Sequence, residues 1–214
     1  MPHQLRAENV TRKFGRKTIL EGISLTFDSG RIYGFVGENG SGKTVFMKML
    51  IGLMKTTSGE ICYDNRKLKK DFDFLPSVGF IIENPGFYPE MTGFDNLKTL
   101  AEIRGIISDE QIREWIRKVG LKDNGEIVDN YSLGMIQRLG IAQALMEDPE
   151  VIILDEVTNS LDEQGTALVY ELLRQQKQQG KIIIISSHIK KDIEELCDEV
   201  YRFRDGGIIC EKKE

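Results

Sequence analysis

The chain has 214 residues, of which 40% are hydrophobic and 29% are charged, and its formal net charge at pH 7 is −5. A chain of this length can bury a substantial core as one large domain, and its acidic balance argues against a nucleic-acid partner. It contains no apolar run long enough to span a bilayer and no apolar N-terminal signal segment, so neither a membrane-spanning nor a secreted protein is expected.

The three cysteines, Cys62, Cys197 and Cys210, show neither C-x-x-C spacing nor an even number. Such a set is not typical of a disulfide framework or of a zinc site. We expect three reduced, half-buried thiols in a cytosolic protein.

The N-terminal region is predicted to be mostly β-sheet, because short apolar or alternating segments are separated by turn residues such as Asp28 and Gly30. Apolar residues at Val45, Met49 and Leu53 have helical spacing and predict one helix within this region. The basic segment 66–70 is expected to be a solvated loop. The expected strands are residues 5–10, 23–27, 32–36, 59–63 and 78–82.

Between the strand at 32–36 and the helix that follows lies a complete G-x-x-x-x-G-K-[ST] motif. Its glycines let the backbone wrap closely around a phosphate, and the following helix start adds a fixed partial positive charge. We predict that Lys43 reaches the β- and γ-phosphates of a nucleoside triphosphate and that the Thr44 hydroxyl ligates Mg²⁺. An ordinary glycine-rich turn is the alternative, which the strand–loop–helix context disfavours. The residues assigned to nucleotide binding here are Gly37, Asn39, Gly40, Ser41, Gly42, Lys43 and Thr44.

Helical spacing dominates residues 93–146. The clearest helix in this stretch begins with Ser108 and Gln111 as a capping box and ends at Gly120. The residues expected on its buried face are Ile112, Trp115, Ile116 and Val119.

Strands and helices alternate again after residue 150. This alternation predicts an α/β fold with a mostly parallel sheet and helices on both faces, interrupted by the helical stretch. The expected strands are residues 151–154, 182–186, 199–204 and 207–210, and the expected helices are 162–178 and 190–196.

The apolar strand at 151–154 is followed by two carboxylates, Asp155 and Glu156. Ligands of α/β sheets bind at the carboxyl ends of the strands, so both acids are expected beside the phosphate loop. Asp155 is assigned to Mg²⁺, directly or through water, and Glu156 to polarising a water for in-line attack on the γ-phosphorus. A solvated turn after a buried strand is the alternative.

A second candidate anion site lies at the start of another predicted helix. Ser132 near its N-cap and Gly134 just inside it present a hydroxyl and free N–H groups. Taken alone, the pattern favours the simpler interpretation that Ser132 only caps its helix.

Over essentially the whole chain, the order and spacing of these motifs resemble the ATP-binding cassette (ABC) ATPases. The S-L-G-M form of the signature is similar to that of bacitracin- and lantibiotic-type export cassettes. The resemblance implies the ABC ATPase fold: a P-loop NTPase core, an N-terminal antiparallel β subdomain and an inserted α-helical subdomain. It also implies one domain, 1–214, with a core of 1–83 and 146–214 and a helical subdomain of 84–145. The matching features are the loop at 37–44, the signature at 131–135, the acids at 155–156, the segment 159–162 and His188.

The resemblance also implies roles for single residues. Phe14 matches the aromatic that stacks on adenine, and His188 matches the residue that contacts the γ-phosphate. In the family two cassettes pack head to tail, so Ser132 and Gly134 would serve ATP on the partner's phosphate loop. Asp162 matches the residue that communicates across this dimer. A core phenylalanine at Phe14 and a structural histidine at His188 are the alternatives.

The sequence departs from the family pattern at several positions. Tyr131, Leu133 and Met135 replace the Leu, the first Gly and the Gln of the usual L-S-G-G-Q signature. Glu83 stands where the family has glutamine at the start of the helical lobe. A carboxylate near a γ-phosphate repels it unless Mg²⁺ lies between them, so we expect Glu83 on the metal side, oriented toward Mg²⁺ or its water.

The function implied is the ATP-binding and ATP-hydrolysing subunit of a membrane ABC transporter, an exporter, with ATP and Mg²⁺ as cofactors. Its implied partners are a permease on a separate chain and a second cassette, and its implied location is peripheral, on the cytoplasmic face of the cell membrane. The alternative is a soluble ABC ATPase of an assembly complex, such as those of iron–sulfur cluster biogenesis. Nucleic-acid machines of this family carry two cassettes or long coiled-coil inserts, which this sequence lacks.

Overall fold

The computed structural model describes residues 3–211 of the chain. Its helices are α1 (Lys43–Leu50), α2 (Gly93–Arg104), α3 (Asp109–Lys118), α4 (Leu133–Leu145), α5 (Glu163–Gln178) and α6 (Lys190–Leu196), with a 3₁₀ turn η1 (Val128–Asn130). Its strands are β1 (Gln4–Phe14), β2 (Lys17–Asp28), β3 (Arg31–Val36), β4 (Ser58–Tyr63), β5 (Arg66–Lys67), β6 (Val78–Ile81), β7 (Val151–Asp155), β8 (Ile182–Ser186), β9 (Glu199–Arg204) and β10 (Gly207–Glu211). Among these described residues, none of the helices combines the length and apolar character needed to cross a bilayer.

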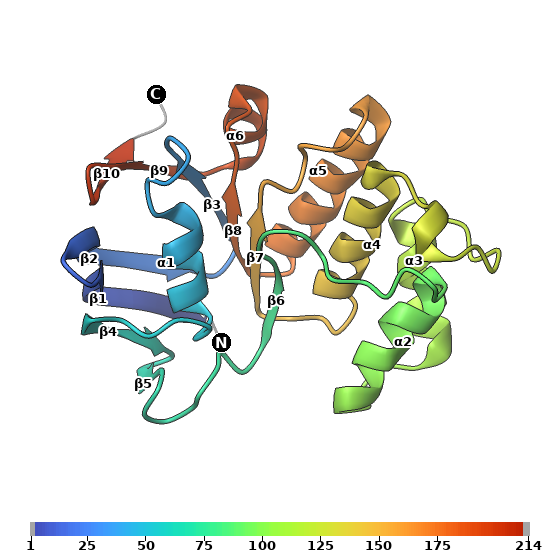
Figure 1. The fold of residues 1–214 in the computed structure, drawn as a ribbon, viewed down its shortest axis with the longest axis horizontal. Helices are drawn as coiled ribbons and strands as arrows, with labels where there is room; N and C mark the ends of the chain where they lie inside the picture. Colours follow the sequence, from blue (N-terminus) through green and yellow to red (C-terminus); the bar gives the residue numbers. More distant parts are fainter. Residues whose placement is uncertain (1–2, 212–214) are drawn as a thin grey trace.

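The strands form two sheets (Figure 1). The N-terminal sheet has the order β2-β1-β4-β5 and is antiparallel. The second has the order β10-β9-β3-β8-β7-β6 and is parallel except for the β9–β10 pair. Because β3, β8 and β7 are neighbours and run parallel, the loops that leave their carboxyl ends lie together at one edge.

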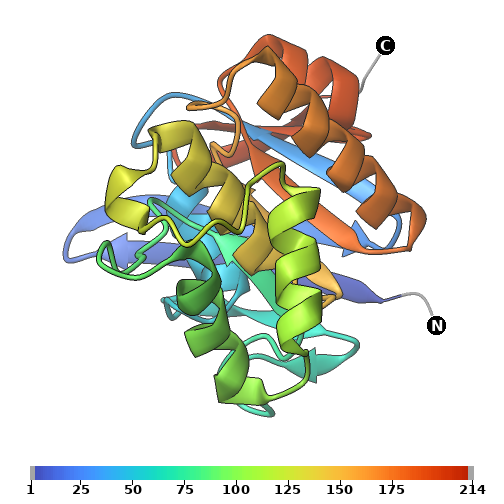
Figure 2. The ribbon, with the colours of Figure 1, turned by 90° about the vertical axis from the view of Figure 1, so that its right-hand side faces the viewer.

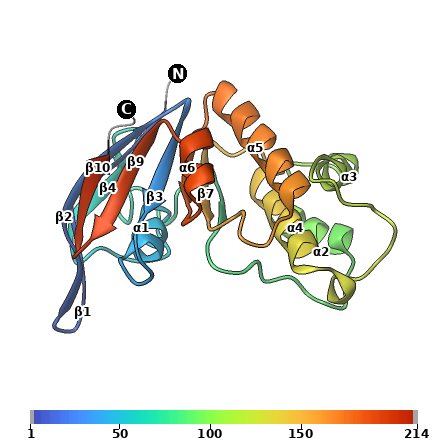
Figure 3. The ribbon, with the colours of Figure 1, turned by 90° about the horizontal axis from the view of Figure 1, so that it is seen from above.

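The parallel sheet is covered on both faces, and its strand side chains alternate between two cores. Ile152 and Leu154 of β7 pack among the helices α2 to α6, whereas Val151 and Ile153 pack with α1 and the antiparallel sheet. Figure 3 shows α1 and the helical layer on opposite sides of this sheet. Burial on both faces explains why these strands are continuous apolar runs.

The helical stretch forms a lobe of α2, α3 and α4, which lies in front of the sheets in Figure 2 and at the far end from the antiparallel sheet in Figure 3. The predicted capping box is present: the Gln111 N–H donates to Ser108 Oγ over 3.3 Å, and the Ser108 N–H donates to Gln111 Oε1 over 2.8 Å. Ile112 and Ile116 are buried, as the spacing predicted. The α/β class, the antiparallel N-terminal sheet and the helical insert are therefore confirmed.

Three expectations about local structure were wrong. Helix α1 ends before Leu53, because the chain turns at Gly52 with φ 87° and passes close to the Asp73 carbonyl. The segment expected to be a loop at 66–70 begins with the short strand β5, which pairs with the end of β4. The thiols are not half-buried: two are buried and one is exposed, namely Cys62 and Cys197 against Cys210.

Candidate functional site

The phosphate loop links β3 to α1 in a backbone conformation that requires glycine at several positions. Gly37 has φ 144° and Gly42 has φ 106°, both in the range that disfavours other residues. A Cβ on Gly37 would lie 2.5 Å from the Phe203 carbonyl oxygen, and one on Gly42 would lie 2.9 Å from Leu20 Cδ2. The loop is therefore packed tightly against the core on its inner side.

Lys43 and Ser41 present the polar groups of this loop. The Lys43 Nζ donates to the carbonyl oxygens of Gly37 and Glu38 over 2.7 and 3.1 Å, and the residue is 7% exposed. Ser41 Oγ is buried and has no hydrogen-bond partner among the described residues. Buried polar atoms are almost always paired, so an orphaned hydroxyl in the same loop as a buried ammonium fits a bound phosphate.

The start of α1 adds to this anion site. Gly42 is its N-cap and provides no side-chain hydrogen bond, and the first turn contains no acidic residue. The first N–H groups of a helix lack partners within it, so these are available to an anion.

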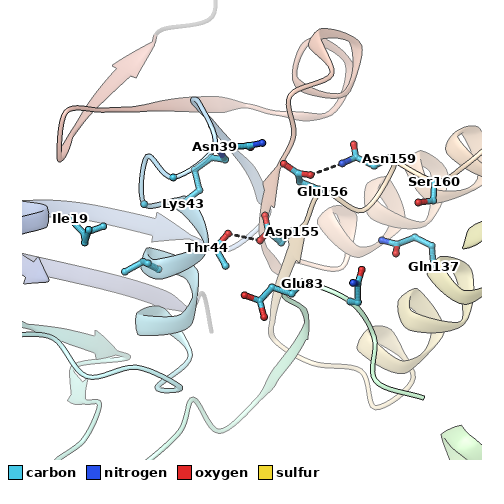
Figure 4. Close-up of a pocket in the computed structure, with 14 residues that line it drawn as sticks. Ile19, Asn39, Lys43, Thr44, Glu83, Gln137, Asp155, Glu156, Asn159 and Ser160 are labelled. Carbon is cyan, nitrogen blue, oxygen red and sulfur yellow. Dashed lines mark hydrogen bonds between the residues drawn. The ribbon is translucent and has the colours of Figure 1, made fainter. Parts of the chain in front are cut away.

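Thr44 and Asp155, two of the three residues assigned to Mg²⁺, lie in contact. The Thr44 hydroxyl donates to Asp155 Oδ2 over 2.8 Å (Figure 4). Asp155 Oδ1 accepts a hydrogen bond from the Ser186 hydroxyl, because β7 and β8 pair with these residues in register. Mg²⁺ is usually held by one or two such protein oxygens together with substrate phosphates, so this donor pair fits the ion. No group of three or more His, Cys, Asp or Glu that could hold a metal by itself occurs in the described part of the chain.

Glu156 lies at the edge of the same site. Its φ is 50°, and its N–H donates to both the carbonyl oxygen and the hydroxyl of Ser186, each over 3.1 Å. Its carboxylate accepts a hydrogen bond from Asn159 Nδ2 over 2.6 Å, and its other oxygen lies 3.6 Å from His188 Nδ1. The predicted base and the predicted γ-phosphate contact are therefore neighbours.

Lys43, Thr44, Asp155 and Glu156 share one cavity of about 490 Å³. Ser41 and His188 line neighbouring cavities instead. The phosphate loop, Glu83, Asp155 and Glu156 line one side of the shared cavity, and Gln137 and Ser160 lie on the other (Figure 4). Its volume is within the range of about 300–1,000 Å³ that small-molecule sites occupy. Residues from five separate segments of the sequence, which include Ile19 of β2, thus converge on one pocket.

Glu83 lines this cavity, but its carboxylate forms an ion pair with a lysine of α1. Glu83 Oε1 accepts a hydrogen bond from Lys48 Nζ of α1 over 2.8 Å, and the residue is exposed. The backbone at Glu83 has φ 67°. The nearby ammonium offsets part of the negative charge that Glu83 brings to the site.

Phe14 lies outside the cavity, at the end of β1. It is 45% exposed, which excludes the alternative of a core phenylalanine. The guanidinium carbon of Arg12 is 4.3 Å from the centroid of its ring. A cation on one face of the ring leaves the other face for stacking.

Ser132, Gly134 and Asp162 are not brought into this cavity. Ser132 caps α4, where its Oγ accepts from the Met135 N–H over 3.2 Å, and Asp162 caps α5, where its Oδ1 accepts from the Gly165 N–H over 2.7 Å. Both residues therefore have a capping role within this chain.

The sequence interpretation missed Ser186 and Asn159, which hold Asp155 and Glu156 in place. Asn159 lies in the segment 159–162 that carries the family resemblance, but the resemblance alone assigns it no role. Ser186 ends the strand beside β7, and only the sheet order reveals that it faces the two acids.

Comparison with known proteins places the chain in a family. A family profile described as "ABC transporter" matches residues 20–159. The chain is 46% identical over 206 residues to the uncharacterized ABC transporter ATP-binding protein YybJ of Bacillus subtilis, covering 96% of this chain and 94% of that protein. It is 39% identical over 214 residues to the bacitracin transport ATP-binding protein BcrA of Enterococcus faecalis (99% and 70% covered). It is 38% identical over 210 residues to the lantibiotic transport ATP-binding protein SrtF of Streptococcus pyogenes (98% and 90%).

Solved structures share the fold. The structure of an ATP-binding subunit of an ABC transporter is similar with a TM-score of 0.87 and 25% identity, covering 97% of this chain and 89% of that one. A dimeric post-hydrolysis state of the ATP-binding cassette MJ0796, bound to ADP and Pi, is similar with a TM-score of 0.85 and 23% identity, covering 97% and 98%. The chain therefore belongs to the ABC transporter family, as one of its ATP-binding, ATP-hydrolysing subunits.

Proposed function

We propose that this chain drives export through a separate permease by binding ATP with Mg²⁺, pairing with a second cassette and hydrolysing the nucleotide. The observation that carries the proposal is the convergence of the phosphate loop, the Thr44–Asp155 pair and Glu156 on one cavity. The printed names of two relatives, in bacitracin and lantibiotic transport, support an export role. Nothing in these relatives favours the iron–sulfur alternative.

In the proposed reaction, Lys43, the Ser41 hydroxyl and the loop N–H groups bind the β- and γ-phosphates. Thr44 and Asp155 hold Mg²⁺, which when bound neutralises phosphate charge. Glu156 accepts a proton from a water whose oxygen attacks the γ-phosphorus in line, while the bond to the β-phosphate oxygen breaks and ADP leaves.

Two further proposed contacts complete the nucleotide site. His188, beside Glu156, contacts the γ-phosphate, and the free face of Phe14 stacks on adenine. Both assignments come from the family resemblance and agree with the exposure of these two side chains.

The proposed assembly is a pair of cassettes on the cytoplasmic face of the cell membrane. Ser132 and Gly134 contact ATP on the partner's phosphate loop, and Asp162 communicates across the dimer. Residues 84–145 form the subdomain that docks the permease, within a single domain that spans 1–214.

The test is co-purification of the tagged chain from solubilised membranes. We expect a polytopic membrane partner, together with ATP hydrolysis that Glu156→Gln slows by at least about 100-fold. Recovery with soluble proteins alone would favour the assembly alternative.

Ser132→Arg is expected to spare ATP binding by the monomer and to block ATP-driven pairing, because the bulky cation fills the facing phosphate site. The measurement is light scattering of Glu156→Gln/Ser132→Arg with ATP. The control is Ser108→Arg, which places the same residue at the N-cap of α3 and should leave pairing intact. A dimer of the Ser132→Arg variant at normal protein concentration would show that Ser132 is only a helix cap.

Glu83→Gln, which restores the family residue, is expected to keep hydrolysis within about tenfold, about 1.4 kcal/mol of barrier, and mainly to weaken the dependence on Mg²⁺. ATPase rates across a Mg²⁺ titration provide the measurement. Lys48→Gln is the matched control, since it breaks the same ion pair and leaves the carboxylate in place. It should not weaken the Mg²⁺ dependence. If Glu83→Gln lost as much activity as Glu156→Gln, Glu83 would take part in the acid–base chemistry.

A further inference from the structure

The carboxylate of Asp192 is buried between the loops that follow β7 and β8. Asp192 of α6 is 1% exposed and lies outside the nucleotide cavity. Its Oδ1 accepts a hydrogen bond from the Tyr170 hydroxyl over 2.5 Å, and its Oδ2 accepts from the hydroxyls of Ser187, over 2.6 Å, and of Thr158. Burying a carboxylate is costly unless hydrogen bonds compensate it, so three converging donors indicate a specific arrangement.

The donors come from three different segments. Thr158 lies two residues after Glu156, in the turn where Asn159 holds the Glu156 carboxylate. Ser187 immediately precedes His188. A single atom, Asp192 Oδ2, therefore connects the loop that follows β7 to the loop that follows β8.

The third donor, Tyr170, belongs to α5, a helix that contains no residue of the nucleotide site. Burial, together with the hydrogen bond to Asp192, raises the pKa of Tyr170 above its ordinary value. Its hydroxyl therefore keeps its proton and remains a donor. This bond fixes the carboxylate against the body of the domain rather than against a loop.

The two site residues do little to position each other directly. The nearest polar atoms of Glu156 and His188 are 3.6 Å apart, and the His188 side chain is 64% exposed. Their separation depends on how the two loops are held. Ser187 Oγ also accepts a hydrogen bond from the Ile189 N–H over 2.9 Å, so the loop around His188 is organised from this same hydroxyl.

We propose that Asp192 is a positioning residue of the ATPase reaction, one that holds the loop of Glu156 and the loop of His188 at a fixed separation. The inference rests on the function proposed above. A general base works only within a narrow range of distances and angles to the water it activates, and displacements of about 1 Å can cost about 100-fold in rate. Nucleotide affinity is set mainly by the phosphate loop, which this link does not touch.

Thr158→Val and Ser187→Ala each remove one hydroxyl from Asp192 Oδ2. Each variant is expected to lower kcat by about tenfold and to leave the KM and Kd for ATP within about twofold. The double variant should be no slower than the slower single variant, because breaking either hydrogen bond breaks the same link.

Tyr170→Phe is the matched control, since it removes the third hydroxyl from the same carboxylate but frees neither loop. It is expected to lower the melting temperature about as much as the loop variants and to leave kcat within about twofold. Circular dichroism and thermal melts establish the folded fraction of each variant.

The outcomes separate the inference from the proposed function. If Tyr170→Phe slowed turnover as much as the loop variants, Asp192 would act only through the stability of the fold. Unchanged kcat in both loop variants, with Glu156→Gln inactive, would overturn the positioning role and leave the proposed function standing. A wild-type protein that does not hydrolyse ATP would overturn the proposed function and this inference with it.

Discussion

Glu156→Gln is expected to bind ATP and Mg²⁺ normally and to hydrolyse ATP on the order of 10²–10⁴-fold more slowly than the wild type, which is the usual contribution of a positioned general base. The substitution keeps the size of the side chain and an oxygen that can accept the hydrogen bond from Asn159 Nδ2. It removes the charge and basicity needed to take a proton from water. Steady-state phosphate release provides the measurement.

Glu163→Gln is the control for this prediction. Glu163 is an exposed carboxylate in the first turn of α5, a short distance along the chain from Glu156 and outside the cavity. Glu163→Gln changes the net charge by the same amount as Glu156→Gln and should leave turnover unchanged. Near-normal turnover of Glu156→Gln would mean that another group is the base.

Lys43→Ala is expected to weaken ATP binding by more than about 100-fold, about 2.8 kcal/mol, and so beyond calorimetric detection. The Lys43 ammonium is the cation of the loop that is expected to bind the phosphates. Charge-assisted hydrogen bonds to phosphate are among the strongest in proteins. Its removal also leaves the carbonyl oxygens of Gly37 and Glu38 without this donor. Isothermal calorimetry provides the affinity, and circular dichroism verifies the fold.

Lys48→Ala is the matched control, because it removes the same charge from the same helix. Lys48 does not line the cavity and pairs with Glu83 at its edge. We expect its loss to weaken ATP binding far less than the loss of Lys43, because it only uncovers part of the charge of Glu83. Unchanged affinity in Lys43→Ala would overturn the assignment of the phosphate site.

Much of the fold could be predicted because its elements have strong local signals. The strands at Val151–Asp155 and Ile182–Ser186 are continuous apolar runs, and α3 carries a complete capping box. The sheet order could not be read from the residues alone, because periodicity identifies a buried strand without naming its neighbours. The placement of β8 between β3 and β7 therefore required the structure.

The candidate site likewise contains residues that a local motif predicts and residues that only the structure reveals. Residues of the loop at 37–44 could be assigned because their chemistry lies in one contiguous motif. Ser186 and Asp192 could not, since each acts on a residue about thirty positions away, Asp155 and Thr158 respectively. The Glu83–Lys48 ion pair is a third contact between residues far apart in the sequence, and no local pattern predicts it.

Light scattering of Glu156→Gln in the presence of Mg²⁺ and either ATP or ADP examines nucleotide binding, slow hydrolysis and pairing in one experiment. We predict a stable dimer, with twice the mass of the monomer, in ATP, and a monomer in ADP. A monomer at saturating ATP, with calorimetry showing the nucleotide bound, would contradict a cassette that pairs across its ATP sites.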